Sequence, residues 1–352
     1  MAAGVLALQG LEVKVASLFT GVGGFDLGFE QAGHEVVYQC ENDPKAQEIL
    51  KKHWPDIHLE ADVKNAKGNI LQELGTQILT AGFPCQNVSV AGNREGLEGD
   101  KSRLWFEVLR IIKEARNIPY IVIENVPGLL SSNKGRDMEV VIKGLEQFGY
   151  QVEYRILDSQ NFRSTPQRRR RVFIVGRPTT GRFGCGPQIL FKSEGLHRDS
   201  TKGEEVQKAN SRDARKSTGN SGRAIVLDRS SFNSGFDFKR VPGIEESETT
   251  PTLIGRGPHG VATTHQRVAP TLNASGAGTS RPGGQGAELG FYVCNPPRRL
   301  TPIETERLQG FPDNFTEGVA DTHRYRFMGN AVTVPVAKWI GQQIQIYEAT
   351  NE

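Results

Sequence analysis

The sequence predicts an α/β fold: a doubly wound, mostly parallel sheet with helices on both faces, joined to a smaller domain that is mostly irregular or β. Three observations predict it. Short apolar runs alternate with amphipathic segments from Leu11 to about Arg177. Beyond Gly181 the chain is rich in glycine, serine, threonine and proline, and helical periodicity fades. Regular periodicity returns at 302–309 and again at 334–346.

The expected elements alternate along the first half of the chain. Short apolar runs predict strands, and apolar residues three and four positions apart predict helices. Pro44 favours a helix start, because the first turn of any helix leaves its N–H groups without partners. The expected strands are 13–19, 35–40, 77–80, 120–123, 152–157 and 172–176. The expected helices are 25–32, 44–53, 104–115, 137–148, 302–309 and 334–346.

These patterns divide the chain into three parts. We expect residues 11–180 to form the first domain, residues 181–320 the second, and residues 321–352 to return to the first. Two stretches in the second part resemble each other, Thr250-Pro251-Thr252-Leu253 and Ala269-Pro270-Thr271-Leu272. Two short copies do not indicate a repeat architecture.

Composition excludes several classes of protein. The 352 residues are 37% apolar and 24% charged, which suits a soluble globular protein, and no apolar run approaches the length of a membrane span. Four widely separated cysteines without a CxxC pair argue against a zinc site or disulfide framework and favour a reducing compartment. The start of the chain lacks a basic leader, so we expect a cytoplasmic protein.

A run of four arginines, 168–171, precedes the expected strand 172–176. The net charge of +3 permits a polyanionic partner only where basic residues cluster, as they do here. Alternate side chains of an extended segment point to opposite faces, so two arginines can enter a site while two face outward. An ordinary solvated face is the alternative, and it is the better interpretation for the pair Arg298-Arg299.

Cys85 is the most informative single residue. It follows the strand expected at 77–80 and stands between Pro84 and a polar, glycine-containing loop, 86–99. The end of a strand is where α/β enzymes present reactive groups. A lone cysteine is more often a small buried hydrophobe, so the local pattern leaves both interpretations open.

A glycine-rich turn, 17–25, stands between the first strand and the first helix. Such a turn lets a ligand approach the backbone, although a tight turn without a ligand is the alternative. Its spacing differs from the dinucleotide fingerprint, which disfavours a nicotinamide oxidoreductase. Glu41 lies about 20 residues further on, where acids bind ribose hydroxyls, and Asp62 could accept from an adenine amino group. Each acid alone is ordinarily a surface carboxylate; together with the turn they indicate an adenosine-containing cofactor.

Glu124-Asn125-Val126 follows the strand expected at 120–123 and faces the same sheet edge as Cys85. Burial beside apolar residues raises the pKa of a carboxyl, so Glu124 is a candidate to carry a proton at neutral pH. A structural or helix-capping glutamate is the alternative.

Six motifs, in order and over nearly the full chain, resemble those of the bacterial and phage C5-cytosine DNA methyltransferases. They are Phe19-Thr20-Gly21-Val22-Gly23-Gly24, Pro84-Cys85-Gln86, Glu124-Asn125-Val126, Gln167-x-Arg169-x-Arg171, Arg299-Leu300-Thr301 through Leu308-Gln309-Gly310-Phe311-Pro312, and Gly329-Asn330-Ala331-Val332. The resemblance implies a Rossmann-like, S-adenosylmethionine-dependent catalytic domain and a target-recognition domain that reads DNA.

The resemblance also implies a mechanism on a cytosine flipped out of the duplex. Cys85 would add to C6 and make C5 nucleophilic, while Glu124 places a proton at N3. Arg171 resembles the arginine that binds the cytosine O2, and Arg169 would support the catalytic loop. C5 then takes the methyl group, and β-elimination of Cys85 releases 5-methylcytosine. The sulfonium is already activated, so no metal is required.

Binding residues follow from the same resemblance. Those expected at S-adenosylmethionine, whose product is S-adenosylhomocysteine, are Phe19, Thr20, Gly21, Gly23, Gly24, Glu41, Asn42, Asp62, Val63, Pro84, Leu104, Asn330, Ala331 and Val332. Those expected at DNA are Gln86, Ser89 and Arg94, with Thr252 and Thr271 as two equal candidates for the family's Thr-Leu element.

Two alternatives share this fold. A tRNA cytosine methyltransferase would use the same catalytic residues but have a smaller variable region than 181–297. A cofactor-binding regulatory protein would be expected to lose Cys85 or Glu124. We therefore expect a monomer, cytoplasmic and nucleoid-associated, that acts on double-stranded DNA in a restriction-modification system, beside a separate endonuclease, or as an orphan enzyme.

Overall fold

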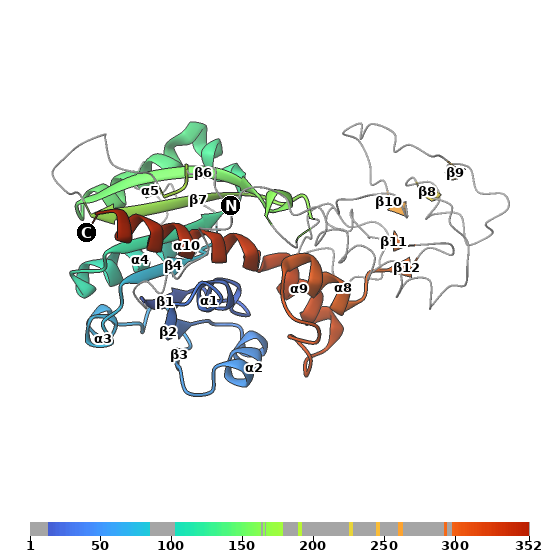
Figure 1. Ribbon diagram of the computed structural model, residues 1–352, viewed down its shortest axis with the longest axis horizontal. Coiled ribbons are helices and arrows are strands. Elements are labelled where there is room, and N and C mark those ends of the chain that lie inside the picture. The colour runs from blue at the N-terminus through green and yellow to red at the C-terminus, as the bar shows by residue number, and fades with distance from the viewer. Residues whose placement is uncertain are drawn as a thin grey trace, which may run out of the picture. The chain divides into compact units, whose positions relative to one another are not determined.

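The computed structural model describes residues 13–84, 103–162, 165, 167–178, 189–191 and 298–351, together with four short strands between residues 225 and 293 (Figure 1). The chain forms two compact units. The first comprises Met1–Asp158, Arg170–Leu196 and Val332–Glu352, and the second comprises Ser159–Arg169 and His197–Ala331. The domain boundaries expected at residues 180 and 320 stay a prediction.

A seven-stranded sheet forms the centre of the first unit, in the order β3-β2-β1-β4-β5-β7-β6. The strands are β1 (Lys14–Leu18), β2 (Glu35–Cys40), β3 (His58–Glu60), β4 (Ile78–Ala81), β5 (Tyr120–Asn125), β6 (Tyr150–Asp158) and β7 (Arg170–Pro178). Strands β1 to β5 are parallel to one another, and β7 is antiparallel to both β5 and β6. The doubly wound, mostly parallel sheet is confirmed, and its order reverses between β1 and β4, where such sheets bind ligands.

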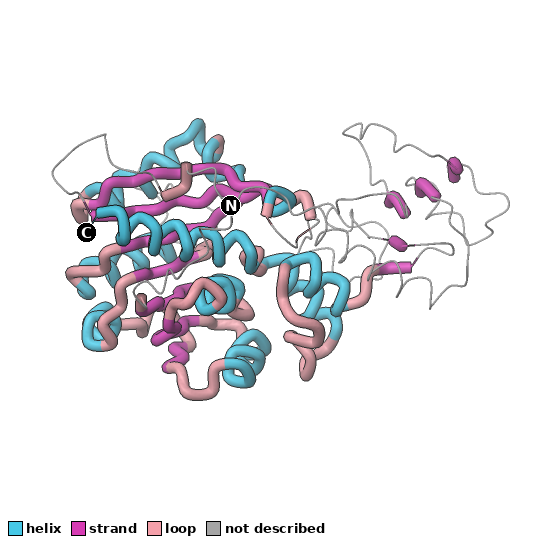
Figure 2. Tube along the Cα trace, in the orientation of Figure 1, coloured by secondary structure: helices cyan, strands magenta, loops and turns pink. Residues whose placement is uncertain are grey.

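Helices cover both faces of this sheet (Figures 1 and 2). They are α1 (Gly24–Glu30), α2 (Pro44–His53), α3 (Gly68–Glu73), α4 (Arg103–Ala115), α5 (Arg136–Glu146) and α10 (Val334–Asn351). Side chains of α3, α4 and α5 pack with β1, β4 and β5 in one large apolar core, in which Trp105 is fully buried. The red C-terminal helix α10 packs against α1 instead, where Gly28 meets Ala337.

The central strands β4 and β5 are buried along their whole length, as expected of parallel strands covered on both faces. This burial continues to the last residues of β5, so Glu124 lies inside the strand rather than after it, which corrects the expected end at residue 123. The strand β7 likewise begins at Arg170, two residues before the expected start, because both arginines pair with β6.

The second unit contains helices α8 (Pro302–Gln309) and α9 (Asp321–Asn330). Thr301 and Glu304 form a reciprocal capping box at the start of α8, and Gly310 ends it at a φ of 80°. Strands β8 (Ile225–Leu227), β9 (Ile244–Glu246) and β10 (Gly260–Ala262) form a three-stranded antiparallel sheet, and β11 (Tyr292–Val293) pairs with β12 (Arg298–Arg299). Short antiparallel strands are what the sequence predicts for a small β domain.

Three short 3-10 helices complete the described structure: η1 (Pro127–Leu130), η2 (Ser132–Gly135) and η3 (Ser159–Asn161). Within the described ranges, no helix combines the length and the apolarity needed to cross a bilayer.

Candidate active site

A carboxylate and a guanidinium meet at the carboxyl edge of the central sheet. Glu124 on β5 and Arg171 on β7 come from adjacent antiparallel strands, and Arg171 Nε lies 3.0 Å from Glu124 Oε1. Their side chains are only 10% and 16% exposed, so the pair is shielded from bulk water. The structure thus brings together two residues that the sequence predicts to be catalytic.

The backbone that leads to the expected nucleophile is fixed against the same pair. Asn125 Nδ2 donates a hydrogen bond of 3.1 Å to the carbonyl of Phe83. The Phe83 ring packs against Trp105 with centroids 5.2 Å apart. A Cβ placed on Gly82 would lie 3.8 Å from Glu124 Oε2. Gly82 therefore lies beside Glu124, and Phe83, two residues before Cys85, is hydrogen-bonded to the adjacent Asn125.

Six predicted site residues lie outside the described residues: Cys85, Gln86, Ser89, Arg94, Thr252 and Thr271. Their roles stay predictions.

The four consecutive arginines alternate as expected. Arg169 is 2% exposed and Arg171 is half-buried, whereas Arg168 and Arg170 are exposed. Arg169 Nη2 donates to the carbonyls of Gly329 and Ala331, at 3.1 and 2.9 Å. These bonds hold the backbone of the last predicted motif, which favours a supporting role for Arg169.

The glycine-rich turn after β1 has the backbone shape that close ligand approach requires. Gly21 and Gly23 adopt φ values of 60° and 84°, a region that favours glycine. The Glu41 carboxylate fastens the turn to the end of β2, because Oε2 accepts from Gly21 N at 2.7 Å and Oε1 accepts from Asp43 N at 2.8 Å. Burial raises the pKa of Glu41, and these backbone donors oppose the rise.

Val332, near the end of the chain, lies against this turn. A Cβ on Gly24 would stand 2.5 Å from the carbonyl oxygen of Val332, so only glycine permits the observed approach. Gly24 and Val332, two predicted cofactor residues from opposite ends of the chain, are thereby in contact.

The remaining predicted cofactor residues of the first unit follow the strands β2, β3 and β4 or lie at the start of α4. Asp62 is half-buried after β3, and its Oδ1 accepts from Lys64 N at 2.9 Å. Val63 is buried, Leu104 is half-buried on α4, and Asn42 and Pro84 are exposed. Arg110, which the sequence analysis missed, fixes this loop by donating to the carbonyls of Val63 and Ala66 at 3.0 and 2.8 Å.

A buried carboxylate below the glycine-rich turn was also missed. Asp26 in the first turn of α1 is fully buried, and its Oδ1 accepts from Ser17 Oγ at 2.9 Å and from Gln39 Nε2 at 3.0 Å. Burial raises the pKa of Asp26 to about 6. An acid in the first turn of a helix is usually explained by its favourable interaction with the helix dipole. The sequence therefore gave no reason to single out Asp26.

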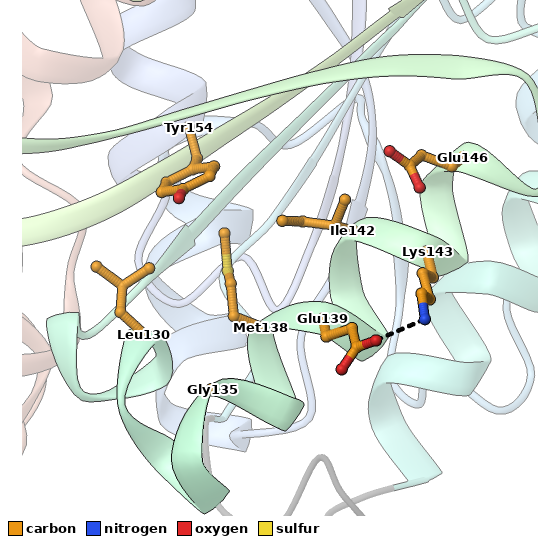
Figure 3. Close-up of a pocket in the computed structure, with 8 residues that line it drawn as sticks. All are labelled: Leu130, Gly135, Met138, Glu139, Ile142, Lys143, Glu146 and Tyr154. Carbon is orange, nitrogen blue, oxygen red and sulfur yellow. Dashed lines mark hydrogen bonds and ion pairs between the residues drawn. The ribbon is translucent and has the colours of Figure 1, made fainter.

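A surface pocket lies apart from these groups, between α5 and β6 (Figure 3). Its lining residues are Leu130, Gly135, Met138, Glu139, Ile142, Lys143, Glu146 and Tyr154. An ion pair of 2.5 Å between Lys143 and Glu139 stands at its side. None of the predicted site residues lines it. Within the residues that the structure describes, no group of three His, Cys, Asp or Glu side chains is placed to hold a metal ion.

Comparisons with known proteins identify relatives of this chain. A family model described as C-5 cytosine-specific DNA methylase matches residues 13–346. The chain is 30% identical to Type II methyltransferase M2.BsuMI of Bacillus subtilis (strain 168), over 94% of this chain and 75% of that protein. It is 32% identical to Type II methyltransferase M.Bsp6I of Bacillus sp. (strain RFL6), over 94% of this chain and 98% of that protein.

Two solved structures share the fold. One is the S. pombe Dnmt2 methyltransferase, with a TM-score of 0.64 and 19% identity over 97% of this chain and all of that one. The other is a putative DNA modification methyltransferase encoded within an E. coli prophage, with a TM-score of 0.63 and 18% identity over the same shares. Identities this low show the fold alone.

Proposed function

The chain belongs to the C-5 cytosine-specific DNA methylases, and on that premise we propose that it methylates cytosine C5 at one short sequence in duplex DNA, with Cys85 as the nucleophile. The observation that carries this proposal is the shielded Glu124–Arg171 pair beside the backbone that leads to Cys85. Its curated relatives are named Type II methyltransferases, which supports a place in a restriction-modification system, with a separate endonuclease as the partner.

The residues after β1, β2 and β3 fit S-adenosylmethionine. The glycine-rich turn exposes backbone to a ligand, and the Glu41 carboxylate retains lone pairs for ribose hydroxyls beyond the two backbone N–H groups that it accepts. Asp62 follows β3 and is assigned to the adenine amino group. The carbonyl of Val332 packs closely against Gly24 of the turn. When bound, the sulfonium supplies an electrophilic methyl group.

The catalytic steps belong to the side chains. The Cys85 thiolate adds to cytosine C6, and the electron pair of the C5–C6 bond becomes available at C5. Glu124 holds a proton at N3, which neutralises the charge that this addition develops on the ring. After C5 is methylated, a base removes the C5 proton, the Cys85–C6 bond breaks, and the double bond re-forms.

Arg171 has two tasks in this arrangement. Its Nε orients the Glu124 carboxyl group, and its Nη1 donates to the carbonyl of Arg170 at 2.8 Å. The remaining N–H groups of the guanidinium fork are assigned to the cytosine O2. Arg169 acts as a positioning residue, since its Nη2 donates to the backbone carbonyls of Gly329 and Ala331.

Reading of the DNA sequence is assigned to residues 181–320, with Thr252 or Thr271 as the Thr-Leu element. The target carbon is inaccessible inside a stacked duplex, so the cytosine must be flipped into the site. Gln86, Ser89 and Arg94 are assigned to the flipped base and the neighbouring phosphates.

Bisulfite sequencing tests this function. We would express the chain and its Cys85→Ser variant in cells that lack cytosine methylation and sequence a resident plasmid. Protected cytosines within one recurring sequence, absent with the variant, are expected. Soluble protein that binds S-adenosylmethionine yet protects no plasmid cytosine would contradict DNA methylation, and methylation of tRNA by the same preparation would favour the alternative substrate.

A further inference from the structure

We propose that Asp26 is a positioning residue for the methyl-donor site: its buried carboxylate ties the ends of β1 and β2 together and so sets the shape of the glycine-rich turn. The inference rests on the proposed binding of S-adenosylmethionine at that turn. It assigns a function to a buried acid that the catalytic steps do not use.

The first step is the contact between α1 and the two strands. Asp26 Oδ1 accepts from Ser17 Oγ on β1 at 2.9 Å and from Gln39 Nε2 on β2 at 3.0 Å. All three side chains are at most 1% exposed. One carboxylate oxygen therefore joins the two strands from which the cofactor residues depart.

The second step leads from Ser17 into the turn. Ser17 Oγ lies 2.9 Å from Thr20 Oγ1, and Thr20 Oγ1 accepts from Cys40 N at 3.1 Å. Thr20 N donates to the carbonyl of Cys40 at 3.0 Å. The next residue after Cys40 is Glu41, which accepts from Gly21 N. Hydrogen bonds thus lead from Asp26 to Thr20 and Cys40, which are directly followed in the chain by the predicted cofactor residues Gly21 and Glu41.

The third step concerns the charge of Asp26, because an ionised carboxylate at this buried position does not stabilise the folded protein. Asp26 Oδ2 is buried and has no hydrogen-bond partner among the described residues, so an ionised Asp26 carries part of its charge without compensation. An asparagine of the same shape would avoid that cost. An ionised carboxylate is, however, acceptor-only, so it requires Ser17 and Gln39 to donate and fixes the direction of the hydrogen bonds that reach Thr20.

The test compares Asp26→Asn with Asp137→Asn. Asp137 is a matched control, because it is also fully buried in the first turn of a helix and accepts from the side chains of Ser132 and Asn133. Neither Ser132 nor Asn133 is a predicted cofactor residue. We would measure the Kd for S-adenosylhomocysteine by calorimetry, the KM for S-adenosylmethionine, kcat, and thermal unfolding, at about pH 8, where Asp26 is ionised.

For Asp26→Asn we expect Kd and KM to rise about tenfold, because hydrogen bonds to a charged acceptor are replaced by weaker bonds to a neutral amide oxygen. We expect kcat at saturating donor to stay within about threefold and the Tm not to fall. Asp137→Asn should lower the Tm and leave Kd within about twofold. A Ser17→Ala variant should weaken binding as Asp26→Asn does, and the double variant should lose no more than either alone, because both act along one path.

An unchanged Kd in Asp26→Asn would overturn the inference while leaving the proposed function intact. A loss of affinity in Asp26→Asn that only tracks a lowered Tm would overturn it as well, because that is the signature of a structural role. Folded wild-type protein that does not bind S-adenosylhomocysteine would instead overturn the proposed function, and this inference with it.

Discussion

Replacing Arg171 by alanine removes one member of the shielded pair and leaves the Glu124 carboxylate in its place. The two groups meet at 3.0 Å with 16% and 10% of their side chains exposed. A hydrogen bond to a charged group of this kind is worth about 1.5–3 kcal/mol, and breaking a buried pair leaves a charge without its partner. We therefore expect the free energy of unfolding to fall by about 2–3 kcal/mol.

The effect on catalysis should be at least as large. Arg171→Ala loses both the orientation of Glu124 and the proposed contact to the cytosine O2, so we expect kcat to fall about 100-fold or more, equivalent to about 3 kcal/mol of transition-state stabilisation. Single-turnover methylation of a duplex that contains the target sequence measures this, and urea unfolding measures stability.

Arg170→Ala is the matched control for this prediction. Arg170 is the preceding residue of the same strand, but its side chain is exposed. Its replacement should change stability by no more than about 0.5 kcal/mol and leave kcat within about threefold. The reasoning is refuted if Arg171→Ala methylates at the wild-type rate, or if Arg170→Ala is equally damaging.

Three further predictions test other parts of the account. Glu124→Gln keeps the size of the side chain but not its acid, so single-turnover methylation should slow by about 10²–10⁴-fold while the folded protein still binds S-adenosylhomocysteine; wild-type turnover would refute proton transfer by Glu124. Gly24→Ala places a methyl group 2.5 Å from the carbonyl of Val332, so urea unfolding should show a loss of about 1–3 kcal/mol and calorimetry a weaker cofactor; unaltered stability and affinity would contradict the close approach. The pKa of Asp26 is raised from 3.8 to about 6, so the folded state holds the Asp26 proton more tightly than the unfolded chain does. The protonated carboxyl therefore contributes its full stability below about pH 4, and about 3 kcal/mol of the free energy of unfolding is lost as the pH rises through about 6. Asp26→Asn should lack this pH-dependent loss in urea unfolding, and a pH profile identical to that of the wild type would contradict the assignment.

Local signals were sufficient for the elements that have clear boundaries. The helix at Pro44–His53 was predicted with both ends correct, because Pro44 occupies its first position and Asp43 caps it by accepting from Lys45 N. The strand Glu35–Cys40 was also predicted with both ends correct. Helix α9 was missed because its sequence is polar with weak periodicity, and only Phe327, Met328 and Gly329 are buried in it.

The features of the site that the sequence did not predict depend on contacts between residues far apart in the chain. Glu124 and Arg171 were predicted separately, from a resemblance, and their pairing depends on the antiparallel register of β5 and β7. Asp26 was missed because it lies in α1, whereas its partners Ser17 and Gln39 lie on the strands β1 and β2. Nothing in a local pattern reports such a contact, since each residue alone has an ordinary explanation.

Covalent trapping tests the central claim most directly. A duplex that carries the target sequence with 5-fluorocytosine at the methylated position would be incubated with the enzyme and S-adenosylmethionine. Fluorine replaces the proton that must leave C5, so elimination of Cys85 is blocked after methyl transfer. The account predicts a stable protein–DNA adduct that survives denaturation and maps to Cys85 by peptide mass spectrometry. The Cys85→Ser variant should form no such adduct. Methylation of the normal duplex without any adduct on the fluorinated one, or an adduct at another residue, would contradict it.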